Sequence, residues 1–152
     1  MYEYVSDVLR AIRIDPKDVM LIRHAPKNKA FSAAHEAGFF KEYTAMQKPG
    51  FAKNKESLMV FIGEPPTKAR FFALYHIANR FPSRAGHVPE GYPNKSEEKA
   101  AGEYLELREE KLPADLKGFT IEWGASTRSW YQHAERDKYI IESEIDTGGA
   151  QE

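Results

Sequence analysis

Two apolar segments separated by a proline-containing turn constrain the fold of this chain most. Residues 57–63 (SLMVFIG) and 69–77 (ARFFALYHI) have the length and the aromatic and β-branched content typical of strands. The segment between them is long enough for a turn, and Pro65 and Pro66 make it too rigid for a helix. The sequence therefore predicts a β-hairpin. Because Phe71 and Phe72 are adjacent and point to opposite sides of their strand, we expect only one of them in the core.

Further strands are predicted on both sides of this hairpin. Residues 19–22 (VMLI) form a short apolar run typical of a buried strand, which would bring Arg23 and His24 to its end. Residues 102–108, 118–123 and 138–144 alternate apolar and polar side chains, as half-buried strands do. No helix regularly follows a strand in the second half, which argues against a parallel doubly wound sheet.

Helical patterns occur mostly in the N-terminal third of the chain. Residues 4–12 place apolar side chains at helical spacing before Asp15 and Pro16, and residues 28–47 fit one long helix or two. Residues 79–96 lack periodicity and are predicted to be a long surface loop. The expected fold is therefore α+β, with about three helices and about six strands in a strongly bent, mostly antiparallel sheet or small barrel. Such a sheet resembles PUA-like folds by analogy of architecture alone.

Length and composition indicate a single domain. The chain has 152 residues with 41% hydrophobic and 30% charged residues, which suffices for one core. We expect residues 1–145 to form this domain and residues 146–152 to be a disordered tail or the start of a linker. No apolar run is long enough to span a bilayer and the N-terminus lacks a secretory pattern, so a cytoplasmic location with no membrane partner is predicted.

The basic residues are distributed unevenly. Residues 1–55 contain ten lysines and arginines against six acidic residues, although the net charge of the whole chain is −1. A local basic surface can bind phosphate on a neutral protein because salt screens distant charges. A chance scatter of charges is the alternative interpretation.

Motifs for catalysis or cofactor binding are absent from the sequence. There is no cysteine, and the five histidines (His24, His35, His76, His87 and His133) show no metal-ligand spacing. Neither a GxSxG elbow nor a GxxxxGK[ST] or GxGxxG loop occurs. We therefore predict no enzyme, no cofactor and no metal. A small hydrolase using His24 or His133 as general base remains a minor alternative.

Residues 123–132 (WGASTRSWYQ) contain the side chains best suited to binding. Aromatic rings stack on bases, an arginine pairs with phosphate or guanine, and hydroxyls at a turn bind phosphate oxygens. The predicted nucleic-acid contacts in this segment are Trp123, Ser126, Thr127, Arg128, Ser129, Trp130 and Tyr131. The alternative is that both tryptophans are core residues and that Ser126 and Thr127 cap a turn, and the alternation of Phe119, Ile121 and Trp123 favours this for Trp123.

A second group of cations is predicted to contact the phosphate backbone. It consists of Arg23, His24, Lys27 and Lys29, together with Lys48, Lys53 and Lys55 in a later turn. Further candidates for the same surface come from the hairpin strand and are Arg70, Phe72 and Tyr75. Solvated lysines without any role are the alternative.

Several strings together resemble a known family. IRH at 22–24, FFKEYT at 39–44, MVFIG at 59–63, TKARFFALYHI at 67–77 and IEWGASTRSWYQ at 121–132 are similar to the region that precedes the GIY-YIG nuclease domain in bacterial restriction-like proteins. The GIY and YIG signatures do not occur here, so no catalytic residue carries over. The resemblance implies an accessory domain that recognises DNA, including modified duplex, for a fused or partner nuclease. A protein-interaction or structural domain with no nucleic-acid role is the alternative function.

Overall fold

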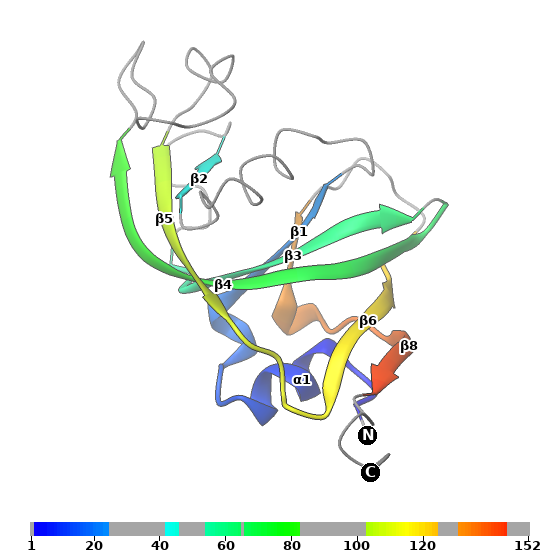
Figure 1. Cartoon of the computed structure of the whole chain (residues 1–152). Coiled ribbons are helices and arrows are strands. Elements are labelled where there is room, and N and C mark those ends of the chain that lie inside the picture. Colours follow the sequence, from blue (N-terminus) through cyan, green and yellow to red (C-terminus); the bar gives the residue numbers. More distant parts are fainter. Residues whose placement is uncertain are drawn as a thin grey trace.

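The computed structural model of the chain describes residues 2–24, 42–45, 54–64, 66–82, 103–124 and 131–145. Its elements, in chain order, are α1 (Val5–Ala11), η1 (Pro16–Asp18), β1 (Val19–His24), β2 (Glu42–Ala45), β3 (Ser57–Glu64), β4 (Lys68–Pro82), β5 (Glu103–Glu110), β6 (Leu116–Glu122), β7 (Tyr131–His133), η3 (Ala134–Arg136) and β8 (Ile140–Ile145) (Figure 1). The predicted hairpin is confirmed as β3 and β4, which pair antiparallel.

One bent, mostly antiparallel sheet contains all of these strands. Its order is β2-β5-β4-β3-β1-β7, with β6 beside β4 and β8 beside β6, and only β1 and β3 pair in parallel. The long strand β4 curves through the molecule, so that β6 pairs with its beginning and β5 with its later part (Figure 1). Within the described residues the sheet does not close on itself, so the expectation of a small barrel is wrong.

The expected helix content is also wrong. In the part of the chain that the structure describes, α1 is the single α-helix, accompanied by the short 3₁₀ turns η1 and η3. Residues 42–45, which were expected to be helical, form β2 and pair with β5. Tyr43 and Thr44 have high strand propensity, and the cross-strand partner outweighs the local helical spacing. Residues 28–41 and 46–47 of the same prediction lie outside the described residues.

The strand β4 is longer than its sequence pattern predicts. Residues 79–82 were expected to begin a loop, yet they continue β4 and pair with β5. The register of β4 against β5 shifts between Ile77 and Asn79. This irregularity interrupts the alternation of apolar and polar side chains, so the sequence pattern does not identify the end of the strand. Residues 83–96 lie outside the described residues.

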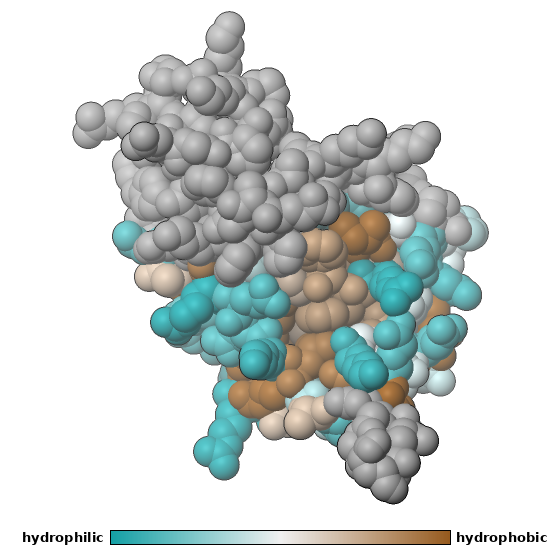
Figure 2. All heavy atoms as spheres, viewed as in Figure 1, coloured by the Kyte–Doolittle hydropathy of each residue, from teal (hydrophilic) through white to brown (hydrophobic). Residues whose placement is uncertain are grey.

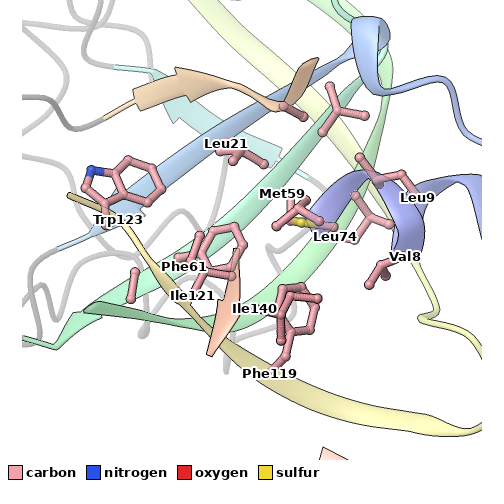
Figure 3. Packing of buried hydrophobic residues seen from close by; sticks show 14 of the residues in the cluster. Val8, Leu9, Leu21, Met59, Phe61, Leu74, Phe119, Ile121, Trp123 and Ile140 are labelled. Carbon is pink, nitrogen blue, oxygen red and sulfur yellow. The ribbon is translucent and has the colours of Figure 1, made fainter. Parts of the chain in front are cut away.

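Buried side chains form two cores, one on each face of the sheet. The helix-side core contains Val5, Val8, Leu9, Val19, Leu21, Met59, Phe61, Ala69, Leu74, Leu116, Phe119, Ile121, Trp123, Ala134 and Ile140, and Figure 3 shows α1 at one end of it and Trp123 at the other. The second core contains Met20, Ile22, Leu58, Val60, Ala73, Tyr75, Ile77 and Leu107.

The two cores correct the expectation for the adjacent phenylalanines of β4. Phe71 packs against the helix-side core, whereas Phe72 packs against the second core, so both are partly buried. Adjacent strand residues do point to opposite faces, as predicted, but here each face is apolar.

Among the described residues, no helix combines the length and the apolar character needed to cross a membrane.

Candidate nucleic-acid interface

Trp123 lies in the core. Its exposed fraction is 0%, and its ring centre lies 6.0 Å from that of Phe61 in the helix-side core (Figure 3). The position follows from the inward alternation of Phe119, Ile121 and Trp123 along β6 and the residue after it. A ring without an exposed face cannot stack on a base, so the predicted base contact by Trp123 is wrong and its core interpretation is confirmed.

Arg23 extends from the end of β1 onto the Trp123 ring. Its guanidinium carbon lies 5.6 Å from the ring centre, within the range of a cation–π interaction. The aliphatic part of Arg23 passes close to Gly63 on the neighbouring strand, where a Cβ atom would lie 3.2 Å from the Arg23 Cδ. The lack of a side chain at Gly63 therefore leaves room for Arg23 to reach the indole.

The backbone around Trp123 is fixed by four hydrogen bonds. The N–H groups of Trp123 and Gly124 donate to the Thr67 carbonyl at 2.7 and 3.1 Å. The Trp123 carbonyl accepts from Gln132 Nε2 at 3.1 Å and from Lys138 Nζ at 3.0 Å. Gly124 has a φ of 121°, which side chains rarely tolerate, so glycine allows the chain to turn here.

The far end of the polar and aromatic segment returns to the same place. Tyr131 pairs with Ile22 and Gln132 with Leu21, through the antiparallel contact of β7 with β1. The described residues that flank positions 125–130 therefore both lie near Arg23, Gly124 through its neighbour Trp123 and Tyr131 through its partner Ile22. We call the five residues Arg23, Trp123, Gly124, Gln132 and Lys138 the Trp123 frame.

Lys138 is the cation of this frame most affected by its surroundings. Partial burial lowers the pKa of Lys138, and the negative charge of Glu122 acts in the opposite direction. Its hydrogen bond to the Trp123 carbonyl gives this amine a structural role.

His24 does not share a site with Arg23. The two residues are neighbours in β1, so their side chains point to opposite faces of the sheet. His24 is only 8% exposed, and burial lowers its pKa to about 4. A buried imidazole that is neutral at pH 7 cannot attract phosphate, so the predicted phosphate contact by His24 is wrong.

Arg70 also lies away from the Trp123 frame. Its neighbour Ala69 points into the helix-side core, which places Arg70 on the opposite face from Trp123. Arg70 Nη2 forms a 2.7 Å ion pair with Glu144 Oε1 on β8, and both side chains are about half exposed. Tyr75, expected on the same binding surface, is fully buried, and its pKa is raised by that burial and by Glu109.

The predicted lysines are only partly described. Lys55 lies just before β3 and donates to the Lys17 carbonyl at 2.7 Å, at the opposite end of the parallel pair β1 and β3 from Arg23. It therefore does not join the Trp123 frame. The predicted contacts Lys27, Lys29, Lys48, Lys53, Ser126, Thr127, Arg128, Ser129 and Trp130 lie outside the described residues, and for Tyr131 only the strand position is described.

Sequence reasoning missed Lys138, Thr67 and the short strand β7. Gln132 belongs to the string WGASTRSWYQ but was not assigned a role. No local signal identifies Lys138 or Thr67, because their contacts with Trp123 come from the pairing of distant strands.

A groove of about 350 Å³ lies elsewhere, beside β4 and the segment between β5 and β6. Phe71, Phe72 and Leu112 line it together with charges of both signs, Glu110 and Lys111 among them, and Figure 2 shows hydrophobic residues gathered between hydrophilic ones on this face. Mixed charges do not favour a polyanion. No group of three or more metal-ligating side chains occurs among the residues described.

Comparison of the chain with protein-family models, curated proteins and solved structures found no match. The resemblance to regions that precede GIY-YIG nuclease domains therefore stays a prediction.

Proposed function

We propose that this chain is a DNA-binding module whose contact surface is residues 125–130, held at both ends by the Trp123 frame. The observation that supports it most is the fixed position of the described residues on either side of this segment. A segment rich in hydroxyls, with Arg128 and Trp130, begins at a backbone fixed by four hydrogen bonds and ends in a strand paired with β1.

Fixed flanking residues favour binding because they reduce the conformational entropy that the interaction has to offset. Hydroxyls and arginine are suited to phosphate oxygens, and a tryptophan ring offers a stacking surface to a base. Arg23 and Lys138 add positive charge next to the segment. Trp123, His24 and Arg70 take no part in the proposed contact, because Trp123 and His24 are buried and Arg70 pairs with Glu144.

The expected ligand is a DNA duplex, and the more specific form of the proposal is a duplex that carries a modified base. This chain would supply recognition only, and cleavage would belong to a fused or partner nuclease. Fluorescence polarisation with plain, methylated and hydroxymethylated duplexes at low salt tests both forms. A modified-base reader should bind one modified duplex at least tenfold more tightly than the plain one.

Two variants test the proposed surface. Trp130→Ala should weaken binding about tenfold to a hundredfold, because stacking contributes ~1–3 kcal/mol per base. Arg128→Ala should weaken binding to all duplexes alike and lower the salt slope by about one if the arginine contacts phosphate. Arg108→Ala, which removes an exposed arginine of β5, is the matched control and should bind as the wild type does.

A structural or protein-interaction domain is the second candidate function. The burial of Trp123 and the ion pair of Arg70 with Glu144 favour it, because both remove side chains from a nucleic-acid surface. A folded wild-type chain that binds no duplex at low salt would establish this candidate and refute DNA binding.

A further inference from the structure

The exposed apolar side chains of the described residues gather at one edge of the sheet. The large hydrophobic residues that are exposed are Tyr4, Tyr139, Ile141 and Ile145. Three of them lie in β8 or directly before it, and Tyr4 contacts Tyr139 edge to face with ring centres 6.0 Å apart. An apolar cluster at a strand edge is typical of an interaction surface.

Among the described strands, β8 pairs only with β6. β6 pairs with one edge of β8, and Figure 1 shows β8 at the end of the sheet, near the N-terminus. The N-terminal residues cover only the first part of the other edge, through hydrogen bonds from Val5 N–H to the Lys138 carbonyl and from Ile140 N–H to the Glu3 carbonyl. Along residues 141–145, no described strand pairs with this second edge. An open edge offers hydrogen-bonding groups to a further strand.

The charges of β8 argue against a second copy of this chain as the partner. In a symmetric antiparallel pairing centred on Ser143, Ile141 would lie opposite Ile145, but Glu142 would lie opposite Glu144. A pairing centred on either glutamate would place that glutamate opposite its own copy. Like charges directly opposite each other destabilise a strand pair.

The same charges favour a basic partner. The sequence of β8, IIESEI, contains two glutamates and no lysine or arginine. Glu142 is exposed, and Glu144 keeps about half of its surface exposed beside Arg70. A strand with lysine or arginine at alternate positions would face these carboxylates and place its apolar residues near Ile141 and Ile145.

We propose that the open edge of β8 binds an extended segment of another protein in which basic and apolar residues alternate, by adding it as a strand to the sheet. Main-chain hydrogen bonds would supply affinity, and the glutamates and isoleucines would supply selectivity. This site is separate from the Trp123 frame and does not depend on DNA binding.

Fluorescence polarisation with a short labelled peptide of alternating lysine and valine tests the proposal. The peptide should bind the wild-type chain, and Glu142→Lys should weaken binding about tenfold by replacing an attraction with a repulsion. Glu135→Lys changes the charge of the chain equally at an exposed position in η3 and should leave binding unchanged.

Two further peptides separate strand addition from simple charge attraction. A peptide with glutamate in place of lysine, and a lysine peptide methylated on every second backbone nitrogen, should both fail to bind. Absence of binding by the unmodified lysine peptide would overturn the proposal, as would equal binding of the methylated one. Sedimentation that shows a dimer lost in an Ile141→Lys variant would also overturn it, because a second copy would then occupy the edge.

Discussion

The guanidinium group of Arg23 lies over the ring of Trp123, 5.6 Å from its centre, and joins the end of β1 to the residue that follows β6. The contact places a cation against the rim of the helix-side core. Arg23 therefore contributes to stability whether or not it also contacts a ligand.

Replacement of Arg23 should measure this contribution. Arg23→Gln should lower the free energy of unfolding by about 1–2 kcal/mol, since it removes the cation–π contact and part of the packing beside Gly63. Arg23→Lys, which keeps the charge, should lose less. Urea denaturation gives both values, and Arg108→Gln, at an exposed position on β5, should stay within about 0.5 kcal/mol of the wild type. Equal losses at both arginines would contradict the role of the Trp123 contact.

The burial of Trp123 predicts its fluorescence. In Trp130→Phe, the remaining indole should emit at short wavelength and resist quenching by acrylamide, because its exposed fraction is 0%. Trp123→Ala should destabilise the domain by about 3–5 kcal/mol through the cavity it leaves. An easily quenched Trp123 in the folded Trp130→Phe variant would show that the core does not extend to this residue.

Asp137 stabilises the start of α1 from a distant part of the chain. Its carboxylate accepts from the Ser6 hydroxyl at 2.5 Å and from the Ser6 N–H at 3.2 Å. Asp137→Ala should lower the free energy of unfolding by about 1–2 kcal/mol, because it leaves the partly buried first turn without these acceptors. Asp115→Ala is a comparison at an exposed carboxylate that bonds the Tyr2 hydroxyl, and its effect should be smaller. Thermal or urea unfolding of both variants gives the comparison.

Arg13 lies just after the C-terminal end of α1, in a backbone conformation that favours glycine. Its φ is 63°, and the bonds from Arg13 N–H to the Arg10 carbonyl and from Ile14 N–H to the Leu9 carbonyl form a Schellman motif. Arg13→Gly should therefore raise the free energy of unfolding by about 0.5–1 kcal/mol. Arg10→Gly, within the same helix, should lower it by about 1 kcal/mol. Thermal denaturation should show opposite shifts for the two variants, and shifts of the same sign would refute this explanation.

The strands that the sequence predicts are those whose pattern is local. Residues 57–63 and 69–77 carry enough apolar and β-branched residues to identify β3 and β4, and the spacing of Val5, Val8 and Leu9 identifies α1. β2 was missed because its partner, β5, lies far along the chain and local spacing there imitates a helix. The three-residue strand β7 is too short for any periodic signal.

Local patterns in the sequence account for only some of the contacts around the candidate site. Composition points to residues 123–132, and alternation along β6 already indicates that Trp123 is buried. The opposite directions of Arg23 and His24 also follow from their adjacency in a strand. The ion pair of Arg70 with Glu144 and the bond from Lys138 to the Trp123 carbonyl depend on the pairing of distant strands, which no local pattern contains.

The burial of His24 predicts that the domain loses stability in mild acid. Burial lowers its pKa from 6.5 to about 4, so the folded chain resists protonation of this residue. Above pH 6.5 the imidazole is neutral in both states and the domain has its full stability. As the pH falls from 6.5 to about 4, the unfolded chain takes up a proton that the folded chain does not, and unfolding is favoured by on the order of 3 kcal/mol in total.

Urea denaturation of the wild type and of His24→Gln, from about pH 7 to about pH 4, isolates this effect. Carboxylates titrate in both proteins, so they cancel in the difference between the two curves. The wild type should lose stability more steeply than the variant between pH 6.5 and about 4, and the difference should become constant below that range. Parallel curves would show that His24 is accessible to protons in the folded domain, and the burial at the end of β1 would then be wrong.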